Sequence, residues 1–338
     1  MRILISSALL LLSNAFIFAQ EPDWVRGKSR EYQDEFYIVG VGSGDTRQGA
    51  ENQARAHIAE VFRVNINANI SVNKSETLNN TQGRVSAESK EVTRSKIDMG
   101  LKKTLEGTEI ADVWQNPKDA TYYALAVLDR EKASMKFAER IRELDVEIGR
   151  ITMKTDSASA KIDKLKLLLL KKNLMSDRNE LNSDLRIVSA SGKGVEPPFS
   201  FEKENSEILG FLQNEFVIGV GGDGPAADVV TQTVTDMFTR SGFIVKRTTG
   251  KEADLIIKIS TSIQPSEEPV DEWYYCRWGL VLNASDPVDG DLIFSSSQNG
   301  KSGQLTKDES KSRAVYDMNK KVGLLAAKVL AKLTGREE

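Results

Sequence analysis

The chain of 338 residues contains a single cysteine, Cys276, and a single histidine, His57. One cysteine cannot form a disulfide within the chain, so the fold must depend on packed cores rather than on covalent cross-links. With no second histidine and no cysteine near His57, a zinc site or a catalytic triad has no ligands or partners to use. We expect His57 at the surface or at a boundary, and Cys276 as a buried structural thiol.

Aromatic residues and net charge are also scarce. Aromatics make up 7% of the chain, the formal net charge is −3, and no basic stretch is interleaved with aromatic residues. These features exclude a nucleic-acid-binding class. The hydrophobic content of 40% and the charged content of 28% are typical of a globular protein, and the length is sufficient for two domains.

The first twenty residues hold the chain's long apolar run, MRILISSALLLLSNAFIFAQ. Arg2 is followed by an apolar stretch from Ile3 to Leu12, and Ala15 and Ala19 offer small residues for cleavage. This pattern predicts a signal peptide over residues 1–19, and therefore an exported, periplasmic protein. The later run LLLL (167–170) is far too short for a membrane span, so any contact with the outer membrane would be peripheral.

Residues 20–130 predict an α+β domain. Apolar residues at helical spacing predict a helix from about Arg47 to Arg63, and alternation from Ile66 to Val72 predicts a half-exposed strand. The polar stretch from Lys74 to Arg94 is either a hairpin or a long loop. Three further strands are expected over Phe36 to Val41, Gly107 to Trp114 and Thr121 to Leu128, the last two joined by the turn NPKDA. One helix followed by successive strands is typical of α+β folds rather than of repeating βαβ units.

Residues 131–188 have the pattern of a helical hairpin. A heptad seam predicts a first helix of five or six turns, and TDSAS (155–159) supplies a break. A second amphipathic helix follows, with a wide apolar face that must be covered by more than its partner helix. The seam consists of Phe137, Ile141, Leu144, Ile148 and Ile151.

The segment 189–200 is rich in Gly, Ser and Pro and is expected to be a linker to a second domain, residues 201–338. Helices are expected there over Phe201 to Gln213, Ala226 to Ser241 and Lys307 to Leu333, and strands over Phe216 to Gly221, Phe243 to Arg247, Ala253 to Ile263, Trp273 to Ser285 and Leu292 to Ser297. The sequence therefore predicts an α+β fold in which two small α/β-sandwich-like domains are joined by a long antiparallel helical hairpin.

Two glycine-rich stretches, YIVGVGSGDT (37–46) and FVIGVGGDGP (216–225), precede predicted helices. Neither carries the full spacing of a dinucleotide or P-loop motif, and a carboxylate at Asp223 would repel a phosphate. We interpret both as structural turns, in which the glycines allow positive φ and close packing of helix on sheet, with Asp223 suited to an N-cap. A phosphate site remains the alternative.

No catalytic, cofactor-binding or metal-binding residue stands out, and no cofactor is expected. Four residues mark a candidate surface for a partner or ligand: Trp24, Trp273, Tyr275 and Arg277. Trp24 follows the expected mature N-terminus. The other three share the second face of their strand, while Cys276 lies on the first. Either that face is uncovered and forms a partner surface, or both faces of the strand are covered, and the sequence leaves both alternatives open.

Four segments resemble the Lpp-twenty-like lipoprotein family of bacterial envelopes. They are the stretch PDWV (22–25), the turn YIVGVGSG (37–44), the helix with Ala50, Ala54, Arg55 and Ala56, and the stretch YYALAVLDR (122–130), which is similar to the closing strand of the family. The resemblance covers about residues 22–130. It implies a small α+β domain at the periplasm or outer membrane, without established catalytic residues, in a family whose relatives include flagellar outer-membrane ring proteins. The lipobox cysteine of the family is missing here. The C-terminal region is similar only in element order to small periplasmic assembly domains of the TolB N-terminal type.

Three functional hypotheses follow from these features. The leading one is a non-enzymatic envelope protein that assembles with envelope partners or with itself, with the hairpin as spacer and docking surface. The second is a periplasmic module that binds a small ligand or glycan by stacking on Trp273 and Tyr275. The third is a nucleotide-dependent enzyme at the loop from Gly40 to Asp45.

Overall fold

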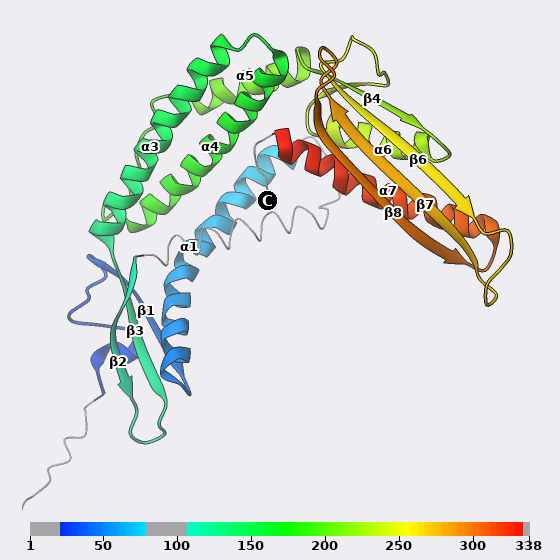
Figure 1. The fold of residues 1–338 in the computed structure, drawn as a ribbon. Coiled ribbons are helices and arrows are strands. Elements are labelled where there is room, and N and C mark those ends of the chain that lie inside the picture. The colour runs from blue at the N-terminus through cyan, green and yellow to red at the C-terminus, as the bar shows by residue number, and fades with distance from the viewer. Residues whose placement is uncertain (1–20, 79–106, 334–338) are drawn as a thin grey trace, which may run out of the picture. The chain divides into compact units, whose positions relative to one another are not determined.

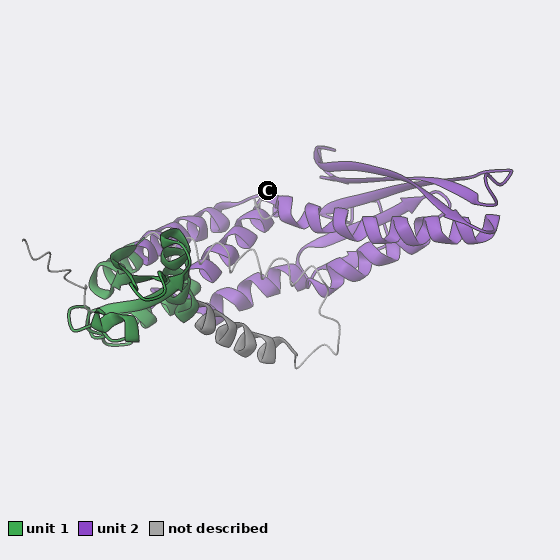
Figure 2. Ribbon diagram, turned by 90° about the horizontal axis from the view of Figure 1, so that it is seen from below, with its two compact units in different colours: residues 1–139, 180–195 green, residues 140–179, 196–338 purple. Residues whose placement is uncertain are grey.

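The computed structural model describes residues 21–78 and 107–333. The predicted signal peptide, residues 1–19, lies outside the described residues. The chain divides into two compact units (Figure 2), the first made of residues 1–139 and 180–195, the second of residues 140–179 and 196–338.

The first unit is built on a three-stranded antiparallel sheet with the order β1-β3-β2 (Figure 1). Its elements are η1 (Asp23–Arg26), β1 (Tyr37–Gly44), α1 (Arg47–Leu78), β2 (Thr108–Gln115) and β3 (Tyr122–Asp129). The turn NPKDA is confirmed, since the backbone N–H of Ala120 donates to the carbonyl of Asn116. Helix α1 packs on one face of the sheet, and the segment around η1 packs on the other.

The strand expected from Ile66 to Val72 is wrong, because α1 continues through this segment to Leu78. Alternating apolar residues favour a strand only when a neighbouring strand is available to pair with them. Extending an existing helix adds one backbone hydrogen bond for each residue fixed, with no need for a partner. The polar stretch from Lys74 to Arg94 begins in the end of α1 and otherwise lies outside the described residues.

The predicted hairpin is present as α3 (Arg130–Ser157) and α4 (Lys161–Val188). Each helix has 28 residues, which is about eight turns, so α3 is longer than the five or six turns expected. All five residues of the predicted heptad seam are buried. The base of the hairpin belongs to the first unit and its tip, residues 140–179, to the second. The wide apolar face of α4 accordingly joins the core of the second unit through Ile162, Leu165, Leu168 and Leu169.

The second unit contains a five-stranded mixed sheet with the order β5-β4-β6-β7-β8. Its elements are α5 (Phe201–Asn214), β4 (Val217–Asp223), α6 (Ala227–Arg240), β5 (Ile244–Lys246), β6 (Leu255–Pro265), β7 (Tyr274–Ser285), β8 (Leu292–Gln304) and α7 (Lys307–Leu333). Strand β4 pairs in parallel with β5 and β6, whereas β6, β7 and β8 are antiparallel to one another.

Helices α6 and α7 lie on the same face of this sheet (Figure 1) and form its core with the inward residues of the strands. Leu255, Ile257 and Ile259 of β6 and Leu280 and Leu282 of β7 are completely buried there. On the opposite face, none of the outward residues of β6, β7 and β8 is buried. The fold class predicted from the sequence, α+β with two sheets and a long helical hairpin, is confirmed.

Candidate functional site

The open face of β6, β7 and β8 carries three of the four residues singled out in the sequence. On β7, Tyr275 and Arg277 point away from the buried Cys276 and Trp278. Trp273, immediately before the strand, retains 43% of its surface. We call the outward residues of these three strands, together with Trp273, the outer face. Of the two alternatives that the sequence left open, the described residues favour the uncovered face.

A tight turn fixes the start of β7 and with it the position of Trp273. Val270 and Trp273 exchange two backbone hydrogen bonds, and the residues between them, Asp271 and Glu272, have φ values of 51° and 67°. Positive φ at two successive residues is the conformation of a type I′ turn, which glycine and asparagine adopt far more readily than glutamate. The backbone N–H of Tyr275 also donates to Oγ of Ser266, at 3.1 Å.

The ring of Tyr275 lies across a glycine on the neighbouring strand. Tyr275 pairs with Gly303 of β8, and a Cβ at Gly303 would lie only 2.9 Å from Cε1 of the ring. The ammonium nitrogen of Lys301 lies 3.5 Å from the ring centroid, a cation–π contact. Lys301 therefore occupies one face of the ring that the sequence proposed for stacking.

The outward residues of β6, β7 and β8 carry only positive charges, while the carboxylate of Asp223 on the neighbouring β4 accepts a hydrogen bond from Ser260 on this face. The charged residues of the outer face are Lys258 on β6, Arg277 on β7 and Lys301 on β8, and no outward position of these three strands holds Asp or Glu. Arg277 and Lys301 stand directly opposite each other in the antiparallel ladder. Like charges opposite each other destabilise a sheet, so the arrangement is one that a negatively charged partner would relieve.

Lys301 and Gly303 were missed in the sequence because β8 was expected to end at Ser297. The strand continues to Gln304 through residues of low hydropathy, and no apolar alternation marks it. The length of β7, twelve residues, could have indicated the full extent of β8, because two antiparallel strands joined by a short turn are expected to have similar lengths.

Trp24, the fourth residue singled out, is not at the surface. It is 5% exposed and packs with Leu125 and Val127 in the core beneath the three-stranded sheet. Its indole Nε1 donates to Oδ2 of Asp112 on β2, at 2.9 Å. The expectation of an exposed Trp24 is therefore wrong, because a tertiary partner distant in sequence satisfies the polar end of the ring.

The first glycine-rich stretch is explained by close packing of α1 on β1. A Cβ at Gly40 would meet the carbonyl oxygen of Ala54, and a Cβ at Gly42 would meet backbone atoms of both Ala50 and Ala54. Neither glycine has positive φ, so only the packing half of the interpretation is confirmed. The close approach of the α1 backbone therefore accounts for Gly40 and Gly42 without a bound phosphate.

The second stretch forms a different turn from the one expected. Asp223 is the last residue of β4 and accepts a hydrogen bond from Ser260, whereas the N-cap of α6 is Ala226. The expected N-cap role of Asp223 is therefore wrong. Oγ1 of Thr261 accepts from the backbone N–H of Ala226 and donates to the carbonyl of Asp223. Gly224 has a φ of 95°, as the interpretation of positive φ requires.

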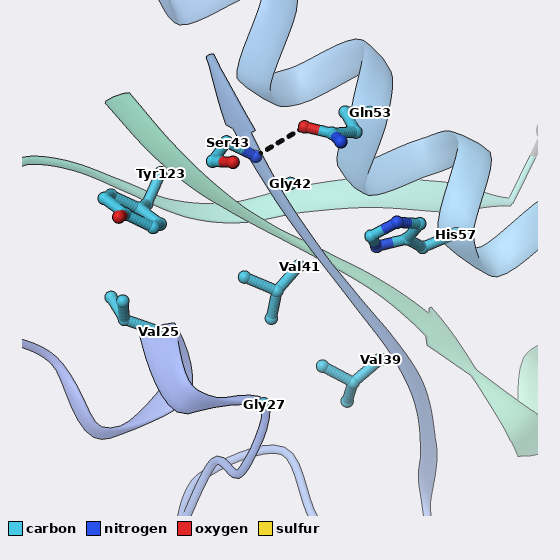
Figure 3. A pocket seen from close by; sticks show the side chains of 9 residues that line it. All are labelled: Val25, Gly27, Val39, Val41, Gly42, Ser43, Gln53, His57 and Tyr123. Atoms are coloured by element: carbon cyan, nitrogen blue, oxygen red, sulfur yellow. Dashed lines mark hydrogen bonds between the residues drawn. The ribbon is translucent and has the colours of Figure 1, made fainter. Parts of the chain in front are cut away.

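A hollow of about 410 Å³ lies beside β1 in the first unit (Figure 3). His57 of α1 is exposed at its rim, as expected of a surface or boundary histidine. Gln53 of α1 reaches across and accepts a hydrogen bond from the backbone N–H of Ser43, at 2.8 Å. The residues that line the hollow are Val25, Gly27, Val39, Val41, Gly42, Ser43, Gln53, His57 and Tyr123.

Cys276 is fully buried, as predicted, and burial raises the pKa of its thiol. A buried neutral thiol is a poor nucleophile. Over residues 21–78 and 107–333, no group of three or more His, Cys, Asp or Glu side chains is arranged to hold a metal ion. The helices in the same part of the chain also include none that is both long and apolar enough to cross a bilayer.

Comparison with known proteins gives one family match. Residues 22–129 match the model of the LPP20 lipoprotein family, which confirms the resemblance predicted from PDWV and YIVGVGSG. No curated protein matches the chain.

Several solved structures are similar at low identity. The secreted protein HP1454 from Helicobacter pylori is 14% identical over 87% of this chain and 98% of its own, with a TM-score of 0.42. A minor lipoprotein from Acinetobacter baumannii is 10% identical over 36% of this chain and 92% of its own, with a TM-score of 0.25. The rare lipoprotein B from Shewanella oneidensis is 9% identical over 35% and 94%, with a TM-score of 0.24. All three TM-scores are below 0.5, so these likenesses assign no function to this chain.

Proposed function

We propose, starting from the LPP20 lipoprotein match over residues 22–129, that the chain is an exported, non-enzymatic protein of the bacterial cell envelope that acts as an assembly component. Its N-terminal pattern supports export, and its family match supports an envelope location. The family match lies in the first unit, and the partner surface that we propose lies in the second.

The outer face of the second unit carries this proposal. Three cations, Lys258, Arg277 and Lys301, lie on a sheet face without a carboxylate at any outward position of β6, β7 or β8. The face is otherwise composed largely of Ser, Asn, Gln and Gly, with Trp273 and Tyr275 at one end. Tryptophan, tyrosine and arginine are the residues that most often dominate binding energy at protein interfaces. We propose an acidic protein surface as the partner of this face.

A glycan-binding module is the second candidate, because Trp273 is exposed and aromatic rings stack on sugars. Lys301 disfavours this alternative, since its ammonium group already covers one face of Tyr275. The nucleotide-dependent enzyme is the third, and it is disfavoured because packing against α1 already explains Gly40 and Gly42.

The test compares charge reversal on two faces of the same unit. Tagged, chromosomally expressed protein would be purified from gently solubilised envelopes, and the stoichiometry of co-purifying envelope proteins would be counted. The double variant Arg277→Glu and Lys301→Glu is expected to lose a stoichiometric partner. The matched variant Lys320→Glu and Lys321→Glu makes the same change of charge at exposed positions of α7 and is expected to keep it.

Three results would contradict the proposal. Retention of the partner by the Arg277 and Lys301 variant would remove the outer face from the assembly. Turnover of a cell-wall or nucleotide substrate by the purified protein at an enzymatic rate would overturn the non-enzymatic assignment. A fluorescence change on adding soluble envelope glycans, abolished in Trp273→Ala, would favour the glycan-binding module instead.

A further inference from the structure

Strand β1 has one open edge in the described part of the chain, because it pairs with β3 and with no other described strand. The hydrogen bonds at its ends tell which residues face that edge. The backbone carbonyl of Phe36 accepts a hydrogen bond from the backbone N–H of Arg130, so the backbone N–H and C=O groups of the even-numbered residues of β1 point toward β3. The backbone groups of the odd-numbered residues Val39, Val41 and Ser43 therefore point outward.

At one position on this edge, Ser43, the backbone N–H is already hydrogen-bonded to a side-chain amide. The N–H of Ser43 donates to the side-chain carbonyl of Gln53, in the place where the carbonyl of a neighbouring strand would lie (Figure 3). The carbonyl of a side-chain carboxamide accepts hydrogen bonds as the carbonyl of a peptide bond does. The next outward positions along the strand, at Val41 and Val39, have no such side-chain partner in the described part of the chain.

Natural sheets protect their edges by short strands, bulges or charged residues. Strand β5 has three residues, β2 contains a register shift beside Asp112, and β8 has both a register shift and Lys301. Strand β1 has eight residues, an unbroken register and the sequence YIVGVGSG, which contains no charge and no proline. Of the edge strands in the two sheets, β1 is the one without these protections.

The open edge lies along the hollow beside β1. Val25 and Gly27, at the end of η1, flank it on one side, and Gln53 and His57 of α1 flank it on the other. The lining contains no Asp, Glu, Lys or Arg, so the hollow offers backbone hydrogen bonds and apolar contact rather than a charged counterpart.

We propose that β1 is a strand-addition site for an extended peptide segment of a partner protein. The segment pairs with the backbone of Val39 and Val41. Its apolar side chains point toward Val25, and its polar side chains point toward Gln53 and His57. The pairing ends at Ser43, whose backbone N–H already donates to the side chain of Gln53. A second copy of this chain is a poorer occupant, because its own β1 lies recessed between the same two flanks. This strand-addition site shares no residue with the outer face.

The probe is a heptapeptide of alternating Thr and Val with N-methyl groups on the Thr amides. Such a peptide can pair through one edge only, with its Val residues opposite Val39 and Val41, so with itself it can form a dimer but no extended sheet. The isomer methylated on the Val amides would have to place Thr toward Val25, and the methylated amides of the fully methylated peptide cannot donate to a strand. Binding to the full chain is expected to weaken at least tenfold for the isomer and to vanish for the fully methylated peptide.

Amide hydrogen exchange in protein labelled with ¹⁵N-valine locates the binding. The Thr-methylated peptide is expected to slow exchange at Val39 and Val41 at least tenfold. Val41→Pro removes one outward N–H and is expected to weaken binding at least tenfold, whereas Val41→Thr keeps the N–H and is expected to bind normally. The exchange measurement on wild-type protein decides the matter even where Val41→Pro does not fold.

Unchanged exchange at Val39 and Val41 with millimolar peptide would overturn the proposal. Equal binding of the two isomers would overturn its assignment of the apolar side. Protection of these two amides in concentrated protein without peptide, together with dimer formation, would show that a second copy is the occupant, contrary to the proposal.

Discussion

Arg178 of α4 and Asp145 of α3 join the two helices of the hairpin through a two-point ion pair. Nε of Arg178 lies 2.9 Å from Oδ1 of Asp145, and Nη2 lies 3.3 Å from Oδ2. Arg178 is fully buried, so the carboxylate of Asp145 stabilises its positive charge where water cannot reach it.

Asp145→Ala is expected to lower the free energy of unfolding by about 3–5 kcal/mol, because it removes the carboxylate that forms a two-point ion pair with a buried guanidinium. Urea unfolding followed by circular dichroism measures this loss. The pair Arg140 and Glu143 on the same helix is exposed, so Glu143→Ala serves as the control and is expected to cost less than about 1 kcal/mol. Equal losses in the two variants would mean that burial does not set the cost.

Gly42→Ala is expected to lower the free energy of unfolding of the first unit by about 1–3 kcal/mol or more. The added Cβ would meet backbone atoms of Ala50 and Ala54, which cannot turn aside as a side chain can. Gly149→Ala on α3 is the matched control, since a Cβ there meets nothing within 4 Å. It is expected to raise helix stability by about 0.5–1 kcal/mol. Thermal unfolding of both variants, compared with wild type, checks the opposite signs.

Arg277→Thr is expected to raise the free energy of unfolding by about 0.2–1 kcal/mol at low salt, because it removes one of two like charges that stand opposite each other. Salt at about 1 M should reduce the gain, since it screens the repulsion from Lys301. Lys258→Thr is the control, because its neighbour across the strands is the neutral Asn283. A gain of the same size and salt dependence in the control would exclude repulsion as the cause.

Cys276 is expected to react with Ellman's reagent at pH 8 at least a hundredfold more slowly in the folded than in the unfolded chain. Burial raises the pKa of its thiol above the ordinary value of 9.0, and the thiolate is the reactive form. The same shift makes stability fall as the pH rises through 9.0 toward the raised pKa, because only the unfolded chain then loses the proton. Cys276→Ala should remove that alkaline loss, as pH-dependent unfolding would measure.

The sequence predicted the elements that local pattern specifies. Helix α7 was placed at Lys307 to Leu333, its bounds in the structure, because its apolar stripe is regular from end to end. The seam from Phe137 to Ile151 was recognised for the same reason. Both elements bury one face at a period that the sequence displays directly.

The predictions that failed concern residues whose structure depends on partners far along the sequence. The second half of β8 is held as a strand by its ladder to β7, although residues such as Asn299 and Gly300 have little strand preference. Trp24 is buried because Asp112, far along the chain, accepts its N–H. For the outer face, the sequence supplied Trp273, Tyr275 and Arg277, but the cationic pairing with Lys301 depends on a register that no local pattern reveals.

The division of the hairpin between the two units governs the order in which the chain can fold during synthesis. The first unit is complete only when residues 180–195 have been made, after the whole tip of the hairpin. That tip must then wait for residues 196–338, and until they arrive Leu165, Leu168 and Leu169 lack the core in which they are buried. The nascent chain therefore passes through a stage with an exposed leucine surface, at which it needs protection from aggregation. Cutting the gene at the linker would fix the protein at that stage rather than yield two independent domains.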